Sequence, residues 1–307
     1  MCLESMVFQL VGQYKQLRLD EAYYLYYIMG NHNKVAHFFF CCFIWLFEKK
    51  FVSLQKKVMK LDKSQRFGTC EAGEVAFNLD VFDRLYDGNL IITKRLTDKL
   101  IEKLIEHKDK IILHLTCTGM GGSVIEPFVP KAEDTYRKFI KLIDGGFPLS
   151  HVVLRIDPIV PTSKGIHTAK GVLNRFGGLG IDRVRISFLD NYKHVRERFK
   201  EAGIDELYGG EFHASLDVRL KALKELTEFA KEYGFTSIEA CGEPGIESVP
   251  CLSQKDVDIL GLTDKITLVG SAEQRKSCHC PANKSELLRV KPQRCRNMCL
   301  YCYWKGE

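Results

Sequence analysis

The sequence predicts an α/β fold, namely a partial (β/α)6 TIM-like barrel over residues 66–272. Short β-rich runs alternate with helical stretches from about residue 88 onward. Most of these runs are almost continuously apolar, as expected of parallel strands that are covered on both faces. Strand–helix alternation of this kind is typical of a parallel sheet, either open or closed into a barrel.

Six runs are expected to form the strands, and six strands suit a partial barrel. These runs are Asn89–Lys94, Ile111–Thr118, Val152–Pro158, Arg183–Asp190, Ser237–Glu243 and Ile266–Gly270.

Three of the connecting helices carry clear signals. Thr97 is expected to cap a helix with an apolar face between residues 100 and 105. A second helix has its apolar face between residues 136 and 143 and is expected to end at Gly145-Gly146. A third and longer helix follows Ser215.

The composition is that of an ordinary globular protein. Of the 307 residues, 45% are hydrophobic and 27% are charged, so a sizeable core can be buried without disulfides. The net charge of +6 is too small to indicate nucleic-acid binding by itself. Residues 273–305 carry eight Lys or Arg and two Glu. This basic segment could line an anionic ligand or be a solvated tail.

Cysteine is abundant and unevenly distributed. The chain has twelve cysteines, and five of them lie between Cys278 and Cys302. Because the sequence shows no convincing secretory signal, a disulfide framework is the weaker interpretation. We expect a cytoplasmic protein whose thiolates bind metal.

Residues 1–65 differ from the rest of the chain and are interpreted as an extension of unknown role. They contain an apolar, aromatic run, Val35–Phe47, which is shorter than the roughly 20 residues that span a membrane. The run could be a buried helix or an interfacial membrane segment. We expect no firm membrane association.

Polar residues gather where the predicted strands end. These positions are Thr116-Cys117-Thr118, Asp157, Asp190 and Cys241-Gly242-Glu243. In folds of this class the chemistry lies at the carboxyl ends of the strands. The two aspartates could equally cap turns.

Two basic residues and one acidic residue are candidate ligand contacts. Lys94 lies at a strand end, where it could reach a carboxylate or a ribose, or form a surface salt bridge. Arg155 lies within an apolar strand, and a buried arginine needs a partner. That partner could be a bound carboxylate, Asp157 or Glu126.

A glycine-rich segment follows the second predicted strand directly. It consists of Thr118, Gly119, Met120, Gly121 and Gly122. Its glycines would let the backbone approach a ligand closely, or they could form a plain turn.

The most specific pattern is a cysteine triplet near the end of the chain. Cys295, Cys299 and Cys302 have the spacing C-x3-C-x2-C, in a segment 273–307 that also contains Cys278 and Cys280. Thiolates are soft donors suited to iron–sulfur clusters and zinc. Three cysteines on one short loop can bind three irons of a cubic 4Fe-4S cluster and leave the fourth iron open for a substrate or cofactor. Cys278 and Cys280 could bind a further metal, support the loop or be inert.

This triplet, with Tyr301 directly before its last cysteine, resembles the radical S-adenosylmethionine signature. The whole tail resembles an uncharacterised family with a radical-SAM-like cysteine cluster at its C-terminus. Residues 91–94, Glu126-Pro127 with Pro130, and residues 153–161 resemble the spore photoproduct lyase-like, "DNA repair photolyase" group.

The resemblance implies a radical SAM enzyme of the lyase or oxidoreductase class. S-adenosylmethionine would bind the open iron, and an external one-electron reductant would drive its cleavage to a 5′-deoxyadenosyl radical. Contacts to the cofactor are expected from Lys94, Thr118, Gly119, Gly121, Gly122, Glu126, Arg155 and Tyr301. By analogy with the lyase group, Cys241 could donate a hydrogen atom, although a lone cysteine is more often a small core residue.

The cluster loop comes last in this chain, whereas it follows the first barrel strand in most radical SAM enzymes. We therefore hypothesise a circularly permuted barrel in which Ile266–Gly270 leads towards the loop. Two other functions stay open at this point. One is a photoproduct-lyase-like activity on nucleic acid, and the other is a non-catalytic binding module in which four tail cysteines hold zinc.

Overall fold

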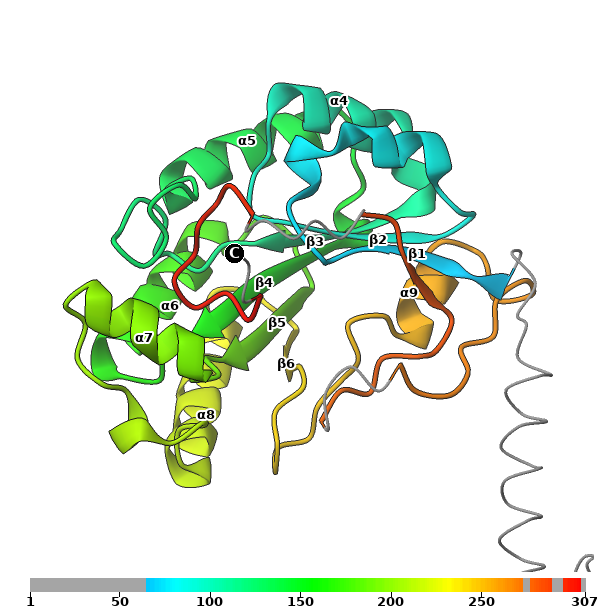
Figure 1. The fold of residues 1–307 in the computed structure, drawn as a ribbon. Coiled ribbons are helices and arrows are strands. Elements are labelled where there is room, and N and C mark those ends of the chain that lie inside the picture. Colours follow the sequence, from blue (N-terminus) through cyan, green and yellow to red (C-terminus); the bar gives the residue numbers. More distant parts are fainter. Residues whose placement is uncertain (1–64, 273–276, 289–294, 305–307) are drawn as a thin grey trace, which may run out of the picture. The chain divides into compact units, whose positions relative to one another are not determined.

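Seven parallel strands form the central sheet (Figure 1). The computed structural model describes residues 65–272, 277–288 and 295–304, and residues 62–307 form one compact unit. The sheet order is β6-β5-β4-β3-β2-β1-β7, and every neighbouring pair is parallel. The strands are β1 (Phe67–Cys70), β2 (Asn89–Thr93), β3 (Ile111–Thr116), β4 (Val152–Ile159), β5 (Arg183–Phe188), β6 (Ser237–Ala240) and β7 (Lys284–Glu286).

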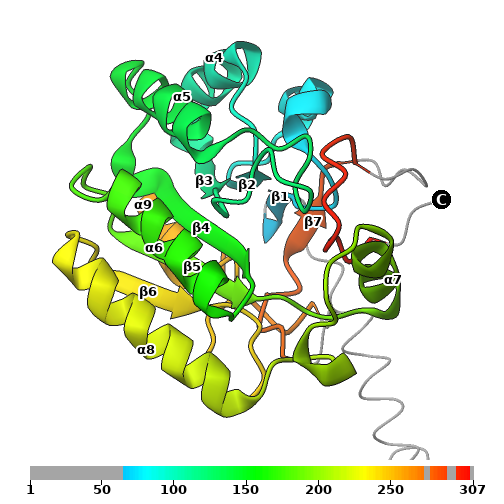
Figure 2. The same cartoon turned by 90° about the vertical axis from the view of Figure 1, so that its left-hand side faces the viewer.

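The helices cover both faces of the sheet. Helices α4, α5, α6 and α8 lie along one face (Figure 2). The short helix α9 lies against the opposite face (Figure 1). The helices of the described residues are α4 (Asp98–Glu106), α5 (Ala132–Asp144), α6 (Ser163–Phe176), α7 (Lys193–Glu201), α8 (Leu216–Glu232) and α9 (Gln254–Ile259).

Alternation along β3 shows how the two faces are built. Ile111, Leu113 and Leu115 belong to the large core under the long helices. Ile112 belongs to a second core that includes Val257 of α9. Because successive side chains of a strand point to opposite faces, a continuously apolar run lets one strand contribute to both cores.

The opposite face also carries buried polar residues. They include His114, Arg155 and Arg185, which the strand register places on the same side of the sheet. Arg185 Nη1 donates to the carbonyl of Cys251 at 2.6 Å. Burial and the neighbouring arginines lower the pKa of His114, which therefore stays neutral.

The α/β class and the parallel sheet are confirmed, as are five of the six predicted strands. The predicted strand Ile266–Gly270 is wrong. Its backbone pairs with the following segment instead: Asn283 accepts from Val269 N at 2.7 Å and donates to Thr267 O at 3.0 Å, and Ala282 N donates to Val269 O at 2.8 Å. The strands β1 and β7, of four and three residues, were not predicted.

The helix-terminus predictions are confirmed. Thr97 accepts a hydrogen bond from Leu100 N at 3.2 Å, and Ser215 accepts one from Val218 N at 3.4 Å. Helix α5 ends at Asp144, with Gly145 as its C-cap. Side-chain capping of this kind satisfies backbone donors that have no partner within the helix.

In the part of the chain that the structure describes, no helix has the length and apolar character needed to cross a membrane. The aromatic run Val35–Phe47 lies outside the described residues.

Candidate functional site

The cysteine triplet lies on a loop at the carboxyl ends of the strands (Figure 1). Leu300 N donates to Ile125 O at 2.9 Å, which joins this loop to the segment after β3. On its other side, Arg198 of α7 donates to the carbonyl of Cys302 at 2.9 Å. Cys299 is buried, whereas Cys295 and Cys302 are half-buried. The loop is therefore held between the segment after β3 and helix α7.

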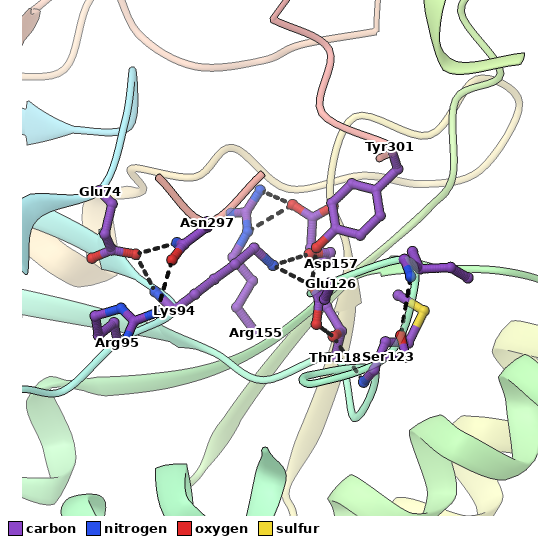
Figure 3. Close-up of polar contacts among 12 residues, drawn as sticks. Glu74, Lys94, Arg95, Thr118, Ser123, Glu126, Arg155, Asp157, Asn297 and Tyr301 are labelled. Carbon is purple, nitrogen blue, oxygen red and sulfur yellow. Dashed lines mark hydrogen bonds and ion pairs between the residues drawn. The ribbon is translucent and has the colours of Figure 1, made fainter. Parts of the chain in front are cut away.

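Glu126 is the first anchor of this loop (Figure 3). Its side chain is fully buried and accepts hydrogen bonds from Thr118 Oγ1 at 2.6 Å and from the hydroxyl of Tyr301. Lys94 Nζ lies 3.3 Å from Glu126 Oε1. A buried carboxylate is stable only with such partners. Glu126 therefore ties the cluster loop to the ends of β2 and β3.

Glu74 is the second anchor, and it follows β1. Its buried carboxylate accepts from Asn297 Nδ2 at 3.1 Å, from Lys94 N at 3.0 Å and from the hydroxyl of Thr93. Burial raises the pKa of Glu74, and these hydrogen bonds oppose that shift. Asn297 also accepts from Arg95 Nη2 at 3.3 Å. Asn297, which lies midway between Cys295 and Cys299, is therefore held by Glu74 at its amide nitrogen and by Arg95 at its amide oxygen (Figure 3).

Lys94 lies between the anchors and the middle of the sheet. Its Nζ donates to Asp157 O at 3.1 Å and lies 5.4 Å from the centroid of the Tyr301 ring. Burial opposes its charge, but Glu126, Cys299 and Asp157 raise the pKa of Lys94, so the ammonium form is favoured. Lys94 is thus a fixed positive charge beside the thiol of Cys299.

Arg155 and Asp157 continue the polar row along β4. Arg155 Nε donates to Asp157 Oδ2 at 2.8 Å, and Nη2 donates to the same oxygen. Ser187 of β5 donates to the other carboxylate oxygen of Asp157. Of the partners considered for Arg155, Asp157 is the one that the structure shows, whereas Glu126 pairs with Lys94.

The three thiols of the triplet differ in burial, and metal binding by them stays a prediction. Burial raises the pKa of Cys299 to about 11, and Lys94 opposes this shift. Within residues 65–272, 277–288 and 295–304, no group of three or more His, Cys, Asp or Glu side chains gathers closely enough to hold one metal ion.

The glycine-rich segment has a structural explanation. Gly119 and Gly122 adopt φ values of 78° and 77°, which favour glycine. A Cβ at Gly121 would lie 1.9 Å from Pro130 O. The glycines therefore permit the tight turn that presents Glu126, and contact with a cofactor stays a prediction for them.

Cys241 lies in a separate group of buried thiols with Cys251 and Cys280. The Sγ atoms of Cys241 and Cys251 are 3.3 Å apart, and Cys251 N donates to Cys280 Sγ at 3.3 Å. Cys278 packs against the same apolar cluster. We therefore assign Cys280 to this thiol group and keep the triplet as the candidate metal ligands.

The two remaining strand-end carboxylates, Asp190 and Glu243, each have polar partners. Asp190 Oδ1 lies 3.0 Å from His213 Nδ1. Glu243 accepts from Phe188 N at 2.7 Å and from Arg219 Nη1 at 3.0 Å. The hydrogen bond from Phe188 to Glu243 joins the carboxyl ends of β5 and β6.

Sequence reasoning did not identify four residues of the site: Glu74, Ser187, Cys251 and Asn297. Asn297 had a detectable signal, since it lies between two cysteines of the triplet. Glu74 had none, because it follows a strand of only four residues.

The comparisons with known proteins identify a family. A search of curated proteins gave no match. A family model described as "Domain of unknown function (DUF1848)" matches residues 87–304. This range includes the six strands β2 to β7 and the whole cysteine triplet. The chain therefore belongs to the DUF1848 family.

Proposed function

We propose that this protein is a radical SAM-like enzyme that binds a 4Fe-4S cluster through Cys295, Cys299 and Cys302. The main support is the position of the triplet loop. Two buried carboxylates, Glu126 and Glu74, hold that loop over the carboxyl ends of the strands. In α/β folds of this kind, this end of the sheet is where catalytic groups lie.

The strand order supports a permuted partial barrel. From β1 to β6, consecutive strands lie side by side, and β7 pairs with the outer side of β1. The triplet follows β7 in the chain. We propose that β7, and not Ile266–Gly270, is the strand that leads into the cluster loop. In a barrel that began at β7, the loop would follow the first strand.

The donor set fits the proposed cluster. The triplet offers three soft sulfur donors. Among the described residues, the cysteines that precede the triplet most closely in sequence are Cys278 and Cys280, and both pack in another core. An iron without a protein ligand would therefore be open to S-adenosylmethionine. When bound, the cluster supplies the electron that cleaves this cofactor. The substrate, the reductant and activity on nucleic acid stay predictions from the sequence.

The protein's own groups would position the cofactor and protect it from water. We propose that Lys94 and Arg155 supply positive charge towards the carboxylate of S-adenosylmethionine. Glu126 orients Tyr301 and Thr118, whose hydroxyls both donate to its carboxylate. Cys241, after β6, is the proposed hydrogen donor.

Anaerobic purification with iron and sulfide analysis tests this proposal. We expect a brown protein with about four irons and four sulfides per chain. Cys299→Ala should remove the cluster, whereas the matched tail variant Cys278→Ala should keep it. The reduced, iron-loaded protein should convert S-adenosylmethionine to 5′-deoxyadenosine.

Two results would contradict the proposal. A colourless protein with bound zinc would identify a zinc-stabilised module instead. An iron-loaded protein that releases no 5′-deoxyadenosine under reducing conditions would exclude the catalytic role and leave only cluster binding.

A further inference from the structure

The buried thiol group beside β6 has the geometry of a reactive cysteine pair. Cys241 follows β6 directly, and Cys251 lies ten residues further along the chain. Their Sγ atoms are 3.3 Å apart, whereas a disulfide bond is about 2.0 Å long. A movement of little more than 1 Å would therefore bring the sulfurs to bonding distance.

The two sulfurs have different surroundings. Arg155 Nη1 lies 3.4 Å from the Sγ of Cys251, and Cys251 N donates to Cys280 Sγ at 3.3 Å. A guanidinium beside a sulfur stabilises the thiolate, which is the nucleophilic form of cysteine. Hydrogen bonds with Cys241 and Cys280 lower the pKa of Cys251. Burial opposes this shift, and the positive charge of Arg155 adds to it. The pKa of Cys241 is raised, first by its contact with Cys251.

We propose that Cys251 and Cys241 form a redox-active pair that reacts with hydroperoxides, with Cys251 as the nucleophile and Cys241 as the thiol that closes the disulfide. The Cys251 thiolate attacks one peroxide oxygen, the O–O bond breaks and hydroxide or alkoxide leaves. The resulting sulfenic acid then reacts with Cys241, which forms the S–S bond and releases water. The peroxide is reduced by two electrons, and the two thiols are oxidised. This reaction needs neither the proposed cluster nor S-adenosylmethionine.

Access and loop conformation suit a small oxidant. Cys241 and Cys251 are only 4% and 7% exposed, so the oxidant in the proposal is a small one. The intervening loop has Gly242 and Gly245 at φ values of 69° and 76°. In the described parts of the chain, these thiols do not belong to a group that could hold one metal ion, so the sulfurs are available for oxidation.

The test uses the full-length protein, purified without iron, and hydrogen peroxide as the probe. Because no Lys or Arg separates the two cysteines, both lie on one tryptic peptide, residues 232–255. After treatment with one equivalent of peroxide and alkylation of free thiols, we expect this peptide to lose two hydrogens and to carry no alkyl group. In Cys241→Ser, dimedone should label Cys251, because no thiol resolves its sulfenic acid.

Cys280→Ser is the matched control and should still form the Cys241–Cys251 disulfide. The isolated buried cysteines Cys70 and Cys117 should remain alkylatable, since burial raises the pKa of both thiols. The proposal is overturned if peptide 232–255 stays doubly alkylated while other cysteines are oxidised. A Cys251–Cys280 disulfide in the wild type, or zinc retained by the three thiols, would also overturn it.

Discussion

At the scale of single residues, the buried carboxylates divide into two kinds. Glu126 and Glu74 connect separate segments, and their oxygens are occupied by donors from the sheet and from the cluster loop. Glu243 instead pairs with Arg219 within the layer formed by β6 and α8. The first kind positions the candidate metal ligands, whereas the second kind mainly influences stability.

Glu243 gives a stability prediction with a defined pH range. Burial raises its pKa from 4.5 to about 7, against the opposing hydrogen bonds from Phe188 and Arg219. The folded state therefore binds a proton more tightly than the unfolded state. The stability from this group is fully present below pH 4.5 and is lost as the pH rises through 7.

We expect the free energy of unfolding of the wild type, relative to Glu243→Gln, to fall by at most about 3 kcal/mol over this range. Urea unfolding of both proteins at several values between pH 4.5 and pH 8 measures this difference. If the free energies of unfolding of the wild type and Glu243→Gln differ by a constant amount across this pH range, the pKa of Glu243 is not raised.

Residue types in the site were predictable, but their partners were not. Lys94, Arg155 and Glu126 stood out because charged groups near apolar strands need partners. Which carboxylate pairs with which base depends on strand register and on a tail residue, Tyr301, that lies 175 positions from Glu126. No local pattern in the sequence contains this information.

At the scale of elements, the cluster loop depends on one amide. Asn297 links the loop to buried Glu74, whereas the neighbouring Met298 side chain is exposed. We expect Asn297→Ala to lower the iron bound per chain severalfold and to cost about 1–3 kcal/mol, because a buried acceptor loses a donor. Met298→Ala is the matched control and should bind iron as the wild type does. Anaerobic iron titration and urea unfolding measure both effects. Equal iron binding by the two variants would show that the loop does not need this anchor.

Element prediction succeeded for the strands of five or more residues and for the four-residue strand β6, and it failed for β1 and β7. The strands β2 to β5 have five to eight residues, and their apolar runs were recognised. The strands β1 and β7 have four and three residues, and β7 is polar. Such segments pair because their neighbours offer free backbone groups, so they follow tertiary structure more than propensity. Ile266–Gly270 shows the reverse case, in which an apolar run finds backbone partners outside the sheet.

At the scale of the whole molecule, the two ends of the described chain meet at one edge of the sheet. β1, near the start, pairs with β2 on one side and with β7 on the other. Lys284 Nζ of β7 lies 2.5 Å from Glu71 Oε1, just after β1. The cysteine tail therefore joins the sheet by the pairing of β7 with β1. Strand β1 precedes residue 87, where the match to the family model begins.

This arrangement predicts different outcomes for two N-terminal truncations. Residues 62–307 keep β1 and Glu74, so this fragment should unfold cooperatively and bind the same iron as the full chain. Residues 87–307 keep the whole family match but lose β1, which removes the sheet partner of β7 and the anchor of Asn297. That fragment should lose its iron and its cooperative thermal transition, since an unpaired three-residue strand has little stability of its own. Circular dichroism on heating and iron analysis distinguish the two. If residues 87–307 behaved like residues 62–307, the tail would be held by contacts other than β1 and Glu74.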